Sequence, residues 1–104
     1  DQVRERRQSN PFYHYHLGET AEAGGDLDAA LQHYMEAIEL KSSEAEFYYR
    51  VARLYLARQQ REESRRFIQE AIERARLVGE RQEYRQFLDR LDSDQVVTAR
   101  VEAG

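Results

Sequence analysis

The chain has 104 residues, 40% of them hydrophobic and 35% charged, with no Cys and one Pro. This composition is typical of a single all-helical domain, and it excludes a disulfide framework, a thiolate metal site and a Cys nucleophile. The net charge of −4 and the lack of a long apolar stretch argue against binding to nucleic acid or membrane, so we expect a soluble protein, with the cytoplasm favoured.

The first half of the chain is predicted to form two helices. Residues 1–10 contain only one sizeable apolar residue, so we expect a tail or the end of a preceding helix. Asn10 and Pro11 open the first helix, because Asn caps free N–H groups and Pro loses no hydrogen bond at the first helical position. That helix ends near Gly24, and Asp26 caps the second. The apolar positions of the two helices, spaced three and four residues apart, are His14, Leu17, Gly18 and Ala21, then Leu27, Ala30, Leu31, Tyr34, Ala37 and Ile38.

Two further helices are expected in the second half. Ser43 and Glu46 are spaced as a capping box that opens the third helix, which ends at a turn around Gln59. The fourth helix covers about residues 61–77, and Gly79 is predicted to stop it.

A fifth helix is predicted over residues 80–91, with Tyr84, Phe87, Leu88 and Leu91 along one side. No further helix follows it. Residues 93–104 mix valines with polar residues, and we expect a frayed tail there.

One segment of the second helix returns almost unchanged later in the chain. Glu36-Ala37-Ile38-Glu39 recurs as Glu70-Ala71-Ile72-Glu73, at an offset of 34 residues. Other pairs at this offset are Tyr15 and Tyr49, Leu17 and Val51, Gly18 and Ala52, Asp28 and Glu62, and Tyr34 and Ile68. A fixed offset of this kind indicates a helical hairpin copied along the chain.

The repeated residues resemble the tetratricopeptide repeat. The pattern is carried by His14-x-x-Leu17-Gly18-x-x-Ala21, then Gly25-Asp26-Leu27, then Ala30-x-x-x-Tyr34-x-x-Ala37. Small residues at Gly18, Ala30 and Ala37 would let the two helices of a unit approach closely. The chain departs from the family pattern at His14, Ala21, Ser42, Gln59 and Arg76, where a Trp, an aromatic residue, a Pro, a Gly and a Pro are usual.

The resemblance implies an all-α fold, a short right-handed α-solenoid of five helices. Its domain would cover residues 11–92, with repeats at 11–44 and 45–78 and a solvating helix at 80–91. The family further implies a concave face that binds a peptide or helix of another protein. We expect a non-enzymatic module without cofactors that is part of a larger protein of bacterial type. The residues carried over to that face are Phe12, Tyr15, Glu19, Glu22, Tyr49, Arg50, Arg53, Leu56, Arg85 and Asp89.

The role of this face has alternatives. Tyr15 and Tyr49 could stack on a ligand or pack against neighbouring helices. Arg50 and Arg53 could pair with a partner's acidic groups or with nearby glutamates. The subclass that grips the C-terminal carboxylate of chaperones has Lys and Asn at the positions of Tyr15, Glu19 and Arg53, so binding of chaperone tails is not expected.

Charge distribution suggests a second function. Residues 11–44 carry seven acids and one base, whereas residues 45–78 carry five acids and eight bases. An acidic unit of one chain could therefore meet a basic unit of another, which makes self-assembly into a homo-oligomer the alternative to binding another protein.

No metal site or active site is expected. His14 and His16 are two residues apart and point to different sides of a helix, and the chain contains no H-x-x-x-H pair. Asp26-Leu27-Asp28 lacks the Gly and the distal Glu of a calcium loop. The sequence also has no Gly-rich phosphate loop and no nucleophile elbow.

Overall fold

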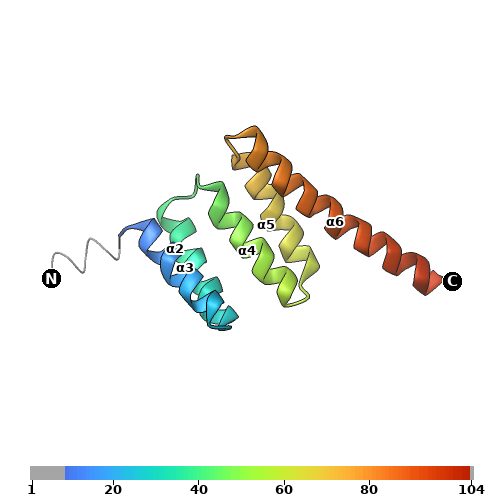
Figure 1. The fold of residues 1–104 in the computed structure, drawn as a ribbon, viewed down its shortest axis with the longest axis horizontal. Helices are drawn as coiled ribbons and strands as arrows, with labels where there is room; N and C mark the ends of the chain where they lie inside the picture. Colours follow the sequence, from blue (N-terminus) through green and yellow to red (C-terminus); the bar gives the residue numbers. More distant parts are fainter. Residues whose placement is uncertain (1–8, 104) are drawn as a thin grey trace.

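The computed structural model describes residues 9–103, with side chains described as far as residue 93. These residues form a row of five helices and no strand, which confirms the predicted all-α solenoid (Figure 1). The helices are α2 (Pro11–Ala23), α3 (Leu27–Leu40), α4 (Ala45–Ala57), α5 (Arg61–Arg74) and α6 (Val78–Ala103). In Figure 1, α4 lies between the α2–α3 hairpin and α5, and the end of α6 extends away from the other helices.

The first two helix starts form as predicted. The side chain of Asn10 accepts a hydrogen bond from the Phe12 N–H at 2.9 Å, and Pro11 is the first residue of α2. Asp26 caps α3 by accepting a hydrogen bond from the Ala29 N–H at 3.1 Å. Each carboxylate or amide oxygen satisfies a backbone donor that the helix itself leaves unpaired.

The capping box predicted at the start of α4 is wrong. The N-cap residue is Glu44, one position after Ser43, and it makes no side-chain capping hydrogen bond. The Glu46 carboxylate instead accepts hydrogen bonds from side chains of α2, α4 and α6. The guanidinium of Arg50 in the same helix and the phenols of two neighbouring helices have taken the place of the local backbone donor.

The region around Gly79 also differs from the expectation. α5 ends at Arg74, because Ala75 has an extended backbone with φ −62° and ψ 128°. Gly79 lies in the first turn of α6 and does not stop α5.

The expected end of the last helix at Leu91 and the frayed tail over residues 93–104 are corrected as well, since α6 continues to Ala103. Residues 80–103 contain no Gly or Pro that would end it. Most of the tail predicted at residues 1–10 lies outside the described residues.

Small residues stand where paired helices cross, as predicted. Gly18 of α2 lies directly beneath the ring of Tyr34 on α3, and a Cβ added to Gly18 would be 2.5 Å from Tyr34 Cε1. Only glycine permits this approach. The other small residues of the crossings, all with 0% exposure, are Ala30, Ala37, Ala52, Ser64 and Ala71.

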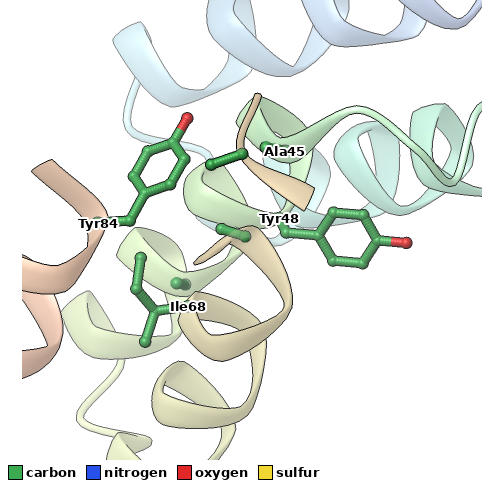
Figure 2. Close-up of a cluster of buried hydrophobic side chains, with 7 residues drawn as sticks. Ala45, Tyr48, Ile68 and Tyr84 are labelled. Atoms are coloured by element: carbon green, nitrogen blue, oxygen red, sulfur yellow. The ribbon is translucent and has the colours of Figure 1, made fainter. Parts of the chain in front are cut away.

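The hydrophobic core runs along the row of helices through α4. One cluster contains Ala30 and Tyr34 of α3 together with Val51 and Leu54 of α4. A second cluster joins the other face of α4 to α5 and α6, and Figure 2 shows Tyr84 projecting from α6 toward the start of α4. Its buried members are Ala45, Tyr48, Ala52, Ile68, Ala71, Ala75 and Tyr84. Because α4 contributes to both clusters, it holds the two repeats together.

None of the helices in the described part of the chain combines the length and the apolar character needed to cross a membrane.

Candidate functional site

Arg50 is the centre of a polar network between α2 and α4. Its Nε donates a hydrogen bond to Glu46 Oε1 at 3.0 Å, and its terminal nitrogens lie 3.5 Å from Glu19 Oε2 and 4.0 Å from Glu22 Oε1. The guanidinium carbon lies 5.4 Å from the centroid of the Tyr15 ring. One cation thus contacts three carboxylates and an aromatic face, which suits the planar donor set of arginine.

Glu46 connects three helices. Its Oε1 accepts a hydrogen bond from the Tyr15 hydroxyl at 3.3 Å, and its Oε2 accepts one from the Tyr84 hydroxyl at 3.1 Å. These contacts place α2, α4 and α6 around a single carboxylate. Glu46 and Tyr84 were not predicted as site residues, because the partners of Glu46 are 31 and 38 residues away along the chain.

The two tyrosines at equivalent repeat positions both pack against the following helices. The Tyr15 ring centroid lies 5.4 Å from that of Phe47. The Tyr49 ring stacks on Tyr84 at 4.8 Å and meets the edge of Phe87 at 5.9 Å. Both tyrosines are nevertheless partly exposed. Each tyrosine therefore packs against a neighbouring helix and also remains partly exposed at the surface.

Burial and nearby carboxylates hold these phenols in their neutral form. Burial, followed by the charge of Glu46, raises the pKa of Tyr15 to about 12. Burial and then Glu83 raise the pKa of Tyr49, and burial also raises the pKa of Tyr34 and Tyr84. Although burial lowers the pKa of Arg50, its hydrogen bond with Glu46 contributes to a net increase. The phenols are hydrogen-bond donors and Arg50 is a cation throughout the neutral range.

Most of the predicted binding residues lie together on the side of the molecule formed by α2 and α4, which we call the α2–α4 face. Its members are Phe12, Tyr15, Glu19, Glu22, Tyr49, Arg50 and Arg53. Arg53 contacts Glu22 at 3.2 Å and lies 5.8 Å from the Tyr49 ring centroid, and Phe12 is 41% exposed. Leu56 is partly exposed in the last turn of α4. Arg50 and Arg53 thus pair with glutamates of their own chain.

Arg85 and Asp89 do not join the α2–α4 face. They line a groove of about 610 Å³ between α5 and α6, together with Gln69, Ile72, Glu73 and Leu88. α6 directs Tyr84 and Phe87 toward α4. Because one residue advances about 100° around a helix, Arg85 is turned toward α5. The family resemblance assigned Arg85 and Asp89 to the binding face, whereas the structure places them in this groove; their part in binding stays a prediction.

A second polar cluster lies between α2 and α3. His14, His33 and Glu36 each place one potential metal-binding atom within 4.8 Å of the others. His14 and His33 come from different helices, so the lack of an H-x-x-x-H pair along one helix does not prevent them from meeting. The described residues contain no other cluster of this kind.

The stacked antiparallel hairpins define a helical-repeat protein. Residues 13–44 and 45–76 each match the family model described as tetratricopeptide repeat. The two matches cover more than half of the chain, which therefore belongs to the tetratricopeptide repeat family and confirms the resemblance. Repeats of this family generally mediate interactions between proteins. Comparison with curated protein sequences gives no match.

Proposed function

We propose that this chain is a non-enzymatic interaction module that binds an extended or helical segment of another protein on its α2–α4 face. The supporting observation is that side chains from both repeats form one continuous polar and aromatic surface around Arg50. Partly exposed aromatic rings beside fixed charges are typical of residues that dominate protein interfaces. Arg50 already contacts Glu19, Glu22 and Glu46, so the surface is ordered before a partner arrives.

The charge of the face favours a basic partner segment. Four carboxylates, those of Glu19, Glu22, Glu46 and Glu83, surround the aromatic rings. Arg50 and Arg53 lie among them, and both are paired with those carboxylates. Lys41 lies 5.2 Å from the centroid of the Phe12 ring and is paired with Glu44. The remaining negative charge attracts Lys or Arg side chains, while Phe12 and Tyr49 offer apolar contact area.

A matched peptide series tests this proposal. Fluorescence anisotropy would compare peptides with the same aromatic and aliphatic residues but either Lys/Arg or Asp/Glu at the charged positions. We expect the basic series to bind more tightly, and its binding to weaken as salt is raised.

Two double variants that remove the same amount of charge test whether the basic peptides bind on the α2–α4 face. Glu19→Gln with Glu83→Gln removes charge from the face and should weaken binding of the basic peptides about fivefold or more, equivalent to about 1 kcal/mol. Glu39→Gln with Glu73→Gln, two exposed glutamates of α3 and α5, should leave it unchanged. Equal binding of acidic and basic peptides, no binding of either series, or equal losses in both variants would disprove the proposal.

Self-assembly is the second candidate, because the first repeat is acidic and the second basic. Part of this complementarity is satisfied within the chain, since Arg58 contacts Asp28 at 3.2 Å and Arg53 contacts Glu22. Light scattering at low and high ionic strength separates the two candidates. A monomer mass at both salt concentrations rules out self-assembly.

A further inference from the structure

The α2–α3 hairpin carries two imidazoles that converge on one carboxylate. His14 Nδ1 lies 2.8 Å from Glu36 Oε2, and His33 Nδ1 lies 3.8 Å from the same oxygen. We propose that His14, His33 and Glu36 form a binding site for a divalent transition-metal ion such as Zn²⁺. This site is separate from the α2–α4 face and does not depend on the function proposed for that face.

The arrangement fits the coordination of a small ion. His33 and Glu36 are three residues apart on α3 and therefore share one side of the helix, while His14 approaches from α2. Zinc binds nitrogen and oxygen ligands at about 2.1 Å, so two ligands of a tetrahedral ion are about 3.4 Å apart. The separations of 2.8 and 3.8 Å lie on either side of this value. Small side-chain rotations would bring all three atoms around one ion, with water in the fourth position.

Burial also suits a metal site. The exposed fractions of the side chains are 13% for His14, 29% for His33 and 37% for Glu36. The imidazoles are thus largely shielded, and the carboxylate leaves a route from solvent. The Nδ1 atom of His33 is buried and has no hydrogen-bond partner in the described part of the structure. A metal ion would satisfy this nitrogen.

The chemistry of the ligands selects the class of ion. Ca²⁺ and Mg²⁺ require mainly oxygen ligands, and Cu⁺ prefers thiolates, so neither class suits two imidazoles and one carboxylate. Zn²⁺, Ni²⁺, Co²⁺ and Cu²⁺ accept this combination. The surplus of acidic residues in the first repeat, seven against one base over residues 11–44, further favours a cation.

Calorimetry of the untagged, chelator-treated chain with ZnCl₂ tests the proposal. We expect one saturable Zn²⁺ site per chain, a higher melting temperature with the ion, and reversal by chelator, because the ion would connect α2 to α3. Co²⁺ should give the intense visible absorption of a four-coordinate site.

Single variants assign the ligands. His33→Ala and Glu36→Gln should each weaken Zn²⁺ binding at least tenfold, since even residues that only support a metal ligand commonly have effects of this size. His16→Ala is the matched control, because His16 is also on α2 but is 75% exposed and pairs with Glu19. Circular dichroism would establish that each variant is folded. Absence of saturable binding to the parent, or equal affinity in folded His33→Ala and the parent, would overturn the proposal.

Discussion

The two repeats use different residue pairs at the same helix crossing. In the first repeat, Gly18 lies beneath the Tyr34 ring. In the second, Ala52 and Ile68 occupy the equivalent positions and belong to one buried cluster. Tyr34 and Ile68 are both 0% exposed. A larger side chain on one helix is thus accompanied by a smaller one on the other, and the filled volume of the crossing governs which residues fit.

The repeats also differ in their polar contacts and turns. Ser64 of α5 donates a hydrogen bond to the Ala52 carbonyl at 2.8 Å, whereas the equivalent residue of α3 is Ala30. Gly25 and Gln59, another pair 34 residues apart, both have positive φ, at 83° and 63°. The second repeat therefore adopts the turn of the first with a residue that is less suited to it.

We expect the largest effect on stability at alkaline pH, where tyrosines of the two repeats and of α6 ionise. The folded-state pKa is raised for Tyr15 and Tyr34 in the first repeat, for Tyr49 in the second and for Tyr84 in α6. A raised pKa means that the folded chain keeps protons that the unfolded chain releases above about pH 10. This stabilisation is complete below pH 10 and is lost as pH rises through the folded values, about 12 for Tyr15.

We therefore expect the free energy of unfolding to fall steeply between pH 10 and 12. Circular dichroism would follow helix content while absorbance near 295 nm follows tyrosinate. Tyr34→Phe should make the decline shallower, because one buried ionisable group is removed. Full ionisation of the tyrosines near pH 10 in a chain that remains helical would contradict their burial.

We expect the next largest effect on stability at the crossing of α2 and α3. Gly18→Ala should lower the free energy of unfolding by roughly 1–3 kcal/mol, because the new methyl group would overlap the Tyr34 ring. In a Tyr34→Ile background, which copies the second repeat, the same change should be neutral or stabilising. The coupling energy from chemical denaturation should therefore be at least about 1 kcal/mol.

Gly79→Ala is the matched control for Gly18→Ala. Gly79 lies in the first turn of α6, and a Cβ added there meets nothing within 4 Å. This variant should gain up to about 1 kcal/mol, since alanine is the better helix former. If Gly18→Ala and Gly79→Ala had the same effect, the proposed contact with Tyr34 would be wrong.

We expect the smallest effect on stability at the turns that contain Gly25 and Gln59. Gln59→Gly should raise the free energy of unfolding by about 1 kcal/mol, because glycine adopts positive φ without a Cβ clash. Gly25→Gln should lower it by a similar amount. Thermal melts of both single variants and of the exchanged pair would measure this difference. A loss of stability in Gln59→Gly would show that the Gln59 side chain contributes more than its backbone conformation costs.

Much of the fold follows from local signals in the sequence. The caps at Asn10 and Asp26 and the apolar spacing of each helix depend on residues within one or two turns, and the 34-residue offset is visible when the sequence is compared with itself. The small residues at the crossings could be recognised for the same reason. The end of α6 was harder to predict, because a stretch without helix breakers can form either a helix or a tail.

The sequence by itself determined that five helices form, which of them make up the repeats, and that Tyr15, Arg50 and their neighbours share one face. Only the tertiary structure decided the partners of Glu46, the meeting of His14, His33 and Glu36, and the turning of Arg85 toward α5. The physical reason is rotation: one residue advances about 100° around a helix, so a small change in a connecting segment alters which side chains meet. Helical periodicity sets the face of each helix, but packing between helices determines what that face contacts.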